Sequence, residues 1–130
     1  MNYQVADTII RIKNAAAAKR RKTFLPYSRM NKAIATILVK EQFLSGLTEE
    51  EQDGRKVLVA AIAYNKRVPM MTDVSIVSKP SLRVYTKAKN LAKRARNGAG
   101  VTVVSTSQGI MTEEQAAKKE IGGEMLFRIW

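Results

Sequence analysis

The dipeptide Asp53-Gly54 constrains the fold of this chain more than any other short stretch of its sequence. It lies between two segments that are typical of extended structure. Glycine tolerates the positive φ angle that a tight hairpin turn needs, so Asp-Gly in this setting is a strong hairpin signal. We therefore expect residues 43–64 to fold back at Asp53-Gly54 as two antiparallel strands.

Two amphipathic helices are expected before this hairpin. Residues 5–21 carry apolar side chains at helical spacing, and their run of alanines favours a helix. A short extended piece, residues 24–28, follows; Pro26 interrupts it, and Ser28 is the expected N-cap of a second helix that ends near residue 42. The buried stripes would consist of Val5, Ile9, Ile12 and Ala16 in the first helix and of Met30, Ile34, Ile37 and Leu38 in the second.

The expected elements divide the chain into two halves. Residues 64–73 are predicted to form a loop and residues 74–80 a strand that Pro80 stops, so residues 1–79 form an α+β half with two helices and a small antiparallel sheet. Residues 80–130 are predicted to be mostly β with short helices. The expected elements there are strands at 82–86, 99–107 and 124–130, a basic helix at 87–98 that Gly98 ends, and a short helix opened by a Thr112–Gln115 capping box and ended by Gly122-Gly123. The predicted fold class is α+β.

Positive charge is abundant and segregated. The 130 residues include 23 lysines and arginines against 11 acids, a formal net charge of +12. No acid occurs from Thr8 to Lys40 or from Val74 to Thr112, whereas bases are frequent in both stretches. Such segregation creates a field that attracts a polyanion, so it favours nucleic-acid binding over a merely solvated basic surface.

Several function classes are disfavoured by what the sequence lacks. With neither cysteine nor histidine, thiolate chemistry, disulfides and the commonest metal ligand are absent, and a serine nucleophile would have only a lysine or a carboxylate such as Glu124 to activate it. The acidic residues 49–53 fit no calcium loop. No apolar run approaches the length that spans a bilayer, and the N-terminus resembles no signal peptide. We expect an intracellular protein without enzymatic activity, metal, cofactor or membrane association.

Three consecutive hydroxyl residues, Ser105, Thr106 and Ser107, stand between an apolar run and Gly109. Hydroxyl groups both donate and accept hydrogen bonds, so they can meet ribose 2′-OH groups, base edges or phosphate oxygens. Alternatively, they satisfy local backbone groups at a turn. Spacing alone leaves both interpretations open, and the surrounding positive charge favours binding.

Other candidate contacts leave a similar choice. Tyr85 either stacks on a base or packs on the sheet with its hydroxyl at the rim. The cluster at residues 19–22 is a solvated helix end, a phosphate clamp, or both. The expected phosphate contacts of this kind are Lys19, Arg20, Arg21, Lys22, Lys93, Arg94 and Arg96.

The order of several short motifs resembles a known family. The motifs are SKP, RVYTK, NGAG, STSQGIMT, GGEML and a C-terminal tryptophan, together with ADTIIRIKNA near the N-terminus. This pattern, over nearly the whole chain, closely resembles the bacterial small ribosomal subunit protein eight family. The resemblance implies a two-part α+β protein that binds the central domain of small-subunit ribosomal RNA early in assembly, beside neighbouring ribosomal proteins, and that in some bacteria represses translation of its own operon messenger RNA.

The resemblance also implies a role for particular residues. The C-terminal half would hold an irregular RNA helix, and the N-terminal half would anchor to RNA backbone. A DNA-compacting protein and a hydrolase remain the alternatives, which competition with duplex DNA and turnover assays would separate. The implied RNA contacts are Ser105, Thr106, Ser107, Gly109, Gly122, Gly123, Glu124, Tyr85, Thr86 and Lys87 in the C-terminal half, and Arg11, Asn14, Ser28, Arg29 and Lys32 in the N-terminal half.

Overall fold

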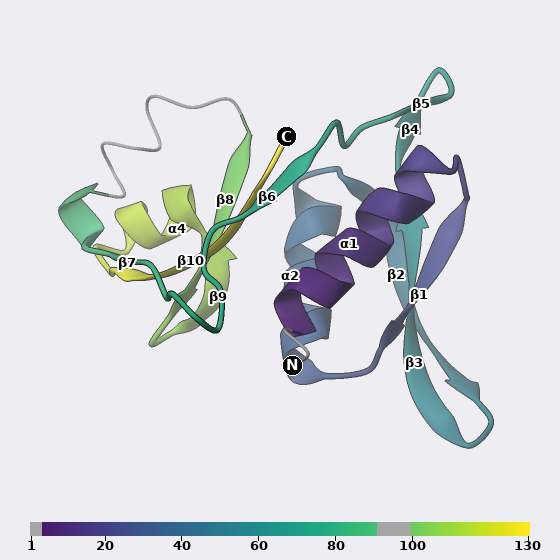
Figure 1. The fold of residues 1–130 in the computed structure, drawn as a ribbon, viewed down its shortest axis with the longest axis horizontal. Coiled ribbons are helices and arrows are strands. Elements are labelled where there is room, and N and C mark those ends of the chain that lie inside the picture. The colour runs from purple at the N-terminus through teal and green to yellow at the C-terminus, as the bar shows by residue number, and fades with distance from the viewer. Residues whose placement is uncertain (1–3, 91–99) are drawn as a thin grey trace. The chain divides into compact units, whose positions relative to one another are not determined.

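The computed structural model describes residues 4–90 and 100–130 of the chain. They form a mixed α+β structure with two compact units, one ending at Thr72 and the other beginning at Asp73 (Figure 1). The division expected from the sequence lies at residue 79. The difference arises because strand β6 (Val74–Ile76) pairs with the C-terminal strand β10 (Gly123–Ile129) and so belongs to the second unit.

Two helices form one layer of the first unit. Helix α1 (Gln4–Ala17) buries the apolar stripe that its spacing predicted, and Thr8 and Ala15 are buried with it. Helix α2 (Arg29–Lys40) begins after Ser28, whose side-chain oxygen accepts a hydrogen bond from the Asn31 backbone N–H at 3.0 Å. The predicted N-cap is therefore confirmed. The helix ends two residues before the expected position.

The buried face of α2 differs from the prediction at its first turn. Met30 was expected in the apolar stripe, but its side chain is 36% exposed, whereas the polar Asn31 is fully buried. Asn31 can be buried because its side chain accepts a hydrogen bond from the Thr8 hydroxyl at 2.6 Å and donates one to the Pro26 carbonyl at 2.8 Å. Because both the oxygen and the nitrogen of its side-chain amide are hydrogen-bonded, burying Asn31 costs little free energy.

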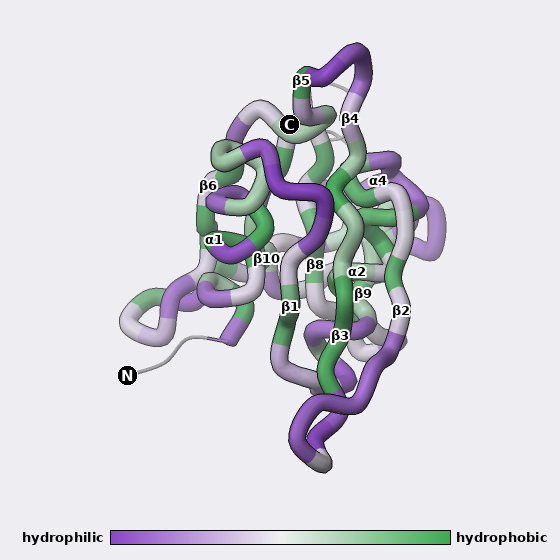
Figure 2. Tube along the Cα trace, turned by 90° about the vertical axis from the view of Figure 1, so that its right-hand side faces the viewer, coloured by the Kyte–Doolittle hydropathy of each residue, from purple (hydrophilic) through white to green (hydrophobic). Residues whose placement is uncertain are grey.

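The second layer of this unit is an antiparallel sheet in the order β1-β3-β2. Its strands are β1 (Lys22–Pro26), β2 (Leu44–Gln52) and β3 (Arg55–Ile62), and α1 and α2 lie on one face of it (Figure 1). The hairpin at Asp53-Gly54 is confirmed, with positive φ angles of 51° and 76° at its two turn residues. Figure 2 looks onto the sheet and shows the middle strand β3 as an apolar stretch above a hydrophilic hairpin end.

A second, smaller hairpin replaces the loop that we predicted at residues 64–73. Strands β4 (Tyr64–Asn65) and β5 (Val68–Pro69) pair across a two-residue turn at Lys66 and Arg67, both of which have positive φ angles. Two-residue turns need this backbone conformation, which usually selects glycine or asparagine. With a lysine and an arginine at the turn, the sequence carried no local signal for it.

The second unit is a five-stranded sheet built around β10. Strand β8 (Val101–Thr106) pairs along one side of β10, and β9 (Gly109–Thr112) pairs with β8 beyond it. The other side of β10 pairs with β6 near its end and with β7 (Tyr85–Thr86) near its start. The strands expected at 99–107 and 124–130 are thus confirmed with small differences at their ends, and the turn between β8 and β9 is also confirmed.

Helix α4 (Glu113–Lys118) covers part of this sheet. It opens with the predicted capping box: the Thr112 hydroxyl accepts from the Gln115 N–H at 3.2 Å, and the Gln115 side chain accepts from the Thr112 N–H at 3.1 Å. Ala116 packs against a buried cluster of Val104, Met111 and Met125. This core holds the helix against the strands that carry the hydroxyl row.

Two strands in this unit are shorter than predicted. The strand expected at 74–80 ends at Ile76, and the one expected at 82–86 is reduced to β7. Between them, the buried Ser78 accepts a hydrogen bond from the Val84 N–H at 2.9 Å, and Lys79 pairs with Leu82 across a tight turn. This local bonding bends the chain out of the extended conformation. Most of the basic helix expected at 87–98 lies outside the described residues.

Candidate nucleic-acid interface

The hydroxyl row lies at the end of β8 and in the turn that follows. Ser105 and Thr106 are the last two residues of β8, Ser107 is in the turn, and Gly109 opens β9 with a φ angle of +114°. The Thr106 hydroxyl donates to the Gly109 carbonyl at 2.8 Å and accepts from the Gln108 N–H at 3.2 Å. Of the two interpretations that the sequence left open, local turn bonding therefore describes Thr106.

The two serines differ from Thr106. Ser105 is half-buried and Ser107 is exposed, and neither hydroxyl is hydrogen-bonded to any residue of the described ranges. An exposed hydroxyl of this kind keeps both its donor and its acceptor available to a ligand. The row thus divides into one residue that shapes the turn and two that remain available.

Two glycines allow β10 to start in the narrow space between β7 and β8. A Cβ atom on Gly123 would lie less than 3.0 Å from the Ser105 carbonyl oxygen, and one on Gly122 would lie 2.6 Å from the Thr86 carbonyl oxygen. Both distances are shorter than real Cβ contacts, and the obstructing atoms are backbone. Only glycine at these two positions lets the three strands approach as they do.

Strand pairing then brings distant residues into one row. Glu124 of β10 lies opposite Tyr85 of β7 on one side and opposite Ser105 of β8 on the other. Residues that are directly opposite in a sheet share a face, so these three side chains stand next to one another. Tyr85 is 71% exposed, which leaves its ring accessible rather than packed on the sheet.

The carboxylate of Glu124 is held in place by a cation that sequence reasoning missed. Its side chain is only 16% exposed, and Arg83 donates to it at 3.0 Å. Arg83 lies two residues before Tyr85, just outside the short strand β7. The spacing of Arg83 and Tyr85 can be read from the sequence, but the pairing of Arg83 with Glu124, 41 residues away, cannot.

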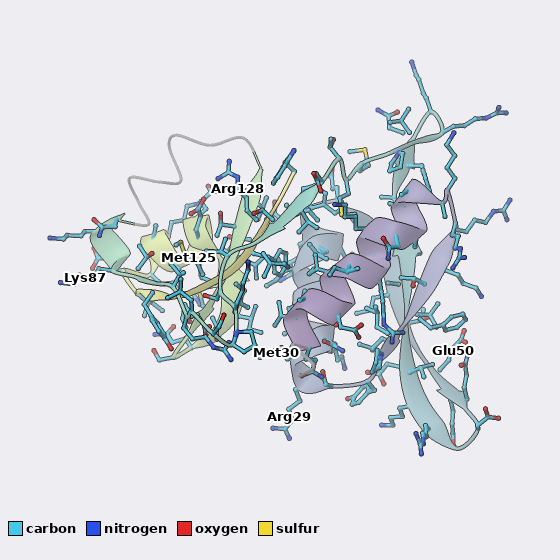
Figure 3. The ribbon with its side chains drawn as sticks, in the orientation of Figure 1. Arg29, Met30, Glu50, Lys87, Met125 and Arg128 are labelled. Carbon is cyan, nitrogen blue, oxygen red and sulfur yellow. The ribbon has the colours of Figure 1, made fainter. Side chains whose placement is uncertain are left out.

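Lys87 and Thr86 complete this edge of the sheet. Thr86 pairs with Gly123, and the Lys87 backbone lies beside Gly122. Figure 3 shows the labelled Lys87 side chain extending away from the sheet, whereas Met125 lies within the unit. The structure therefore brings together, on one end of the second unit, the predicted residues Tyr85, Thr86, Lys87, Ser105, Thr106, Ser107, Gly109, Gly122, Gly123 and Glu124. We call this group the glycine edge.

The predicted contacts of the first unit fall into two groups. Asn14 and Arg29 are exposed, and Figure 3 shows Arg29 extending outward. The others are engaged within the protein: Ser28 caps α2, the Arg11 guanidinium pairs with Asp7 at 3.1 Å, and Lys32 pairs with Glu49 at 2.8 Å. The cluster Lys19, Arg20, Arg21 and Lys22 is exposed after α1, and Lys93, Arg94 and Arg96 lie outside the described residues.

The Lys32–Glu49 pair has a consequence that can be measured. The hydrogen bond from Lys32 lowers the pKa of Glu49, and the same bond raises the pKa of Lys32. The contribution of the pair to folding is therefore lost as the pH falls through the lowered pKa of Glu49, or as it rises through the raised pKa of Lys32. Lys32→Ala is expected to return the pKa of Glu49 toward its ordinary value in a carboxyl-carbon NMR titration.

A matched control is available on the same helix. Lys40→Ala removes the same charge from the exposed end of α2 without touching Glu49, and it should leave the titration of Glu49 as it is. A pKa of Glu49 that is the same with and without Lys32 would contradict the assignment.

Within residues 4–90 and 100–130, no three histidine, cysteine or acidic side chains are grouped as a metal ion would require. None of the helices in those ranges has the length and apolar character needed to cross a membrane.

Comparison with known proteins supplies a family. The family model described as "Ribosomal protein S8" matches residues 3–130. The chain is 39% identical over 131 residues to "Small ribosomal subunit protein uS8" of Trichormus variabilis and 40% identical over 131 residues to the protein of that name from Microcystis aeruginosa; each alignment covers 99% of this chain and 98% of the relative. The corresponding protein of Mycoplasmopsis agalactiae is 39% identical over 126 residues, which are 97% of this chain and 95% of the relative.

Proposed function

The chain belongs to the ribosomal protein S8 family, and we propose that within the small ribosomal subunit it binds ribosomal RNA directly through the glycine edge. As a member of this family it is a structural protein of the small subunit in the cytoplasmic ribosome, and it is not an enzyme. The resemblance seen in the sequence is confirmed. The direct RNA contact and its location are our proposal.

The observation that carries the proposal is the arrangement of the glycine edge. Two glycines let β7, β10 and β8 converge, so that the exposed ring of Tyr85 and the available hydroxyls of Ser105 and Ser107 lie at one end of a rigid sheet. A convergence of free hydroxyls, an exposed ring and a nearby lysine serves no purpose in packing. It is well suited to a polar, planar and negatively charged ligand.

Each part of the edge has a distinct role in the proposed complex. Ser105 and Ser107 exchange hydrogen bonds with ribose 2′-OH groups or base edges, and Tyr85 stacks on a base that has left the helix. The carboxylate of Glu124, held by Arg83, accepts hydrogen bonds from base amino groups or ribose. Because these partners are fixed in a sheet, they select one RNA shape rather than any RNA.

Positive charge supplies the affinity that this selection requires. Lys87 belongs to the edge, and the exposed side chains that anchor RNA backbone on the first unit are Asn14, Lys19, Arg20, Arg21, Lys22 and Arg29. Lysines and arginines that neutralise phosphates release counterions, which favours binding without regard to sequence. Arg11 and Lys32 contribute less, because Asp7 and Glu49 already neutralise them.

The finer assignments rest on the family resemblance. We propose that the target is an irregular helix in the central domain of small-subunit ribosomal RNA, that binding supports assembly beside neighbouring ribosomal proteins, and that a similar structure in the protein's own operon messenger RNA is a second target. Crosslinking in cells followed by RNA sequencing tests all of these at once. A sharp peak in one small-subunit helix is the expected result, and a peak in the operon transcript would report autorepression.

Removing either free hydroxyl should weaken the specific complex. Ser105→Ala and Ser107→Ala are each expected to reduce affinity for the cognate ribosomal RNA fragment by about 5- to 10-fold, because one net hydrogen bond contributes about 1 kcal/mol. Affinity for an unrelated RNA duplex should stay unchanged. Filter binding at constant salt measures both.

Ser81→Ala is the matched control, since Ser81 is an exposed serine of the same unit that lies in a different turn. It should leave both affinities intact. If all three variants lost the same affinity, or none lost any, the glycine edge would not be the specific contact. Competition by duplex DNA as effective as by the ribosomal fragment would instead favour the DNA-compacting alternative.

A further inference from the structure

The first unit contains a groove at the edge of its sheet. It has a volume of about 470 Å³ and lies where the end of β1 separates from the start of β3, beside the exposed edge of β1. A volume of this size falls in the range of small-ligand sites. The lining residues are Arg11, Phe24, Leu25, Pro26, Tyr27, Gln52, Arg55, Lys56 and Val57.

Two aromatic rings in this groove are open to solvent. Phe24 is 38% exposed and Tyr27 is 37% exposed, although large aromatic residues usually bury most of their surface. Each ring has a lysine ammonium beside it: Lys22 lies 5.5 Å from the centre of the Phe24 ring, and Lys56 lies 5.3 Å from that of Tyr27. Each ring is therefore paired with a cation on the protein surface.

The lining of the groove is positively charged, which favours an anionic ligand. Its lining contains three cations and no acid. Asp7 pairs with Arg11, which also donates to the Phe24 carbonyl at 3.4 Å, so Arg11 serves to fix α1 to the edge of β1. Lys56 faces Glu51 across the hairpin, whereas Arg55 faces the neutral Gln52. Arg55 makes no ion pair with any residue of the described ranges, and its guanidinium is available.

These features together match one nucleotide of a single strand. An exposed aromatic ring offers a stacking surface for any base, and a cation close to the ring meets the adjoining phosphate. A base inside a duplex has no free face for such a ring, so the site requires an unstacked residue. We propose that this groove binds an unpaired nucleotide of single-stranded RNA, with its base on Tyr27 or Phe24 and its phosphate on Arg55 and Lys56. The proposal rests on the proposed RNA-binding function and adds a second contact, on the first unit.

The 130-residue chain can be tested with labelled hexauridylate by fluorescence anisotropy at 50 mM salt. Arg55→Gln with Lys56→Gln should weaken binding at least 10-fold, and Tyr27→Leu, which keeps an apolar side chain but removes the ring, at least 5-fold. The matched control is Lys66→Gln with Arg67→Gln, which removes the same two charges from the exposed turn of the same unit. It should change affinity less than 2-fold. Equal losses from the two double variants would overturn the proposal.

Two further measurements separate the possible causes of a negative result. Photocrosslinking with a 4-thiouridine hexamer should attach to Phe24 or Tyr27, and attachment elsewhere would overturn the proposal even if affinity fell. A labelled hexaglutamate peptide should bind weakly; binding as tight as that of hexauridylate, with the same loss in the groove variants, would mean that the groove takes an acidic protein segment instead.

The cognate ribosomal RNA fragment is measured in parallel with the same variants. If the fragment binds and hexauridylate is indifferent to the groove variants, the inference fails and the proposed function stands. If hexauridylate binding depends on the groove but the fragment does not bind, the proposed function fails and the groove remains a single-strand site.

Discussion

Replacing Gly123 with alanine is expected to lower the free energy of unfolding by about 3 kcal/mol and to remove specific RNA binding. The new Cβ atom would lie less than 3.0 Å from the Ser105 carbonyl oxygen and 3.0 Å from the Thr106 Cγ2 atom. Because the first of these is backbone, it cannot swing aside as a flexible side chain would. Strand β10 must then move away from β8, and the row from Tyr85 to Ser105 opens with it. Urea unfolding and filter binding measure the two effects.

Gly46→Ala is the control for this experiment. Gly46 also lies in a sheet, beside a register shift in β2, but a Cβ atom there meets nothing within 4 Å and its φ angle is not in the left-handed region. It should change stability by less than about 1 kcal/mol, as an added methyl in open space does. If Gly123→Ala were as stable and as active as Gly46→Ala, the close approach of β10 and β8 would not be what shapes the glycine edge.

Affinity for the cognate RNA is expected to fall about 10³-fold between 50 and 200 mM salt, which corresponds to about six neutralised phosphates. Cations without an acidic partner should dominate this response. Arg11, Lys32 and Arg83 pair with Asp7, Glu49 and Glu124, so they release few counterions on binding. The cations that are exposed, and that form no ion pair within the described ranges, include Lys19, Arg20, Arg21, Lys22, Arg29 and Lys87.

Removing charges from the cluster at residues 19–22 tests whether these cations contact phosphates. Arg20→Gln with Arg21→Gln should reduce the slope of log affinity against log salt by about 2, since each phosphate contact contributes about 0.9. The double variant at Lys66 and Arg67 should leave the slope unchanged. An affinity that hardly responds to salt, or equal slopes for both double variants and the unmodified chain, would contradict the proposal that this cluster contacts phosphate.

Local patterns predicted the elements where each residue's role depends on its neighbours in sequence. The stripe from Val5 to Ala16, the Ser28 cap, the Asp53-Gly54 turn and the Thr112 capping box are all present as expected. Each depends on contacts over four residues or fewer, so propensity and spacing are sufficient.

Prediction was weaker where partners are distant in the chain. The assignment of β6 to the second unit depends on pairing with β10, about 50 residues away. Burial of Asn31 in place of Met30 depends on Thr8, 23 residues earlier. The candidate site shows the same limit: its residue types stood out in the sequence, but the row of Tyr85, Glu124 and Ser105 exists only once β10 lies between β7 and β8.

The two helices of the first unit, the Asp53-Gly54 hairpin, the excess of positive charge and the candidate residues were thus determined by the sequence itself, since short-range geometry and composition depend on nothing else. The tertiary structure decided which of those residues are available. It paired Lys32 with Glu49 and Arg83 with Glu124, 41 residues away, and it placed Tyr85, Glu124 and Ser105 side by side. A hydrogen bond or an ion pair is satisfied by whatever lies within about 3 Å, and only folding brings residues from distant parts of the chain to that distance.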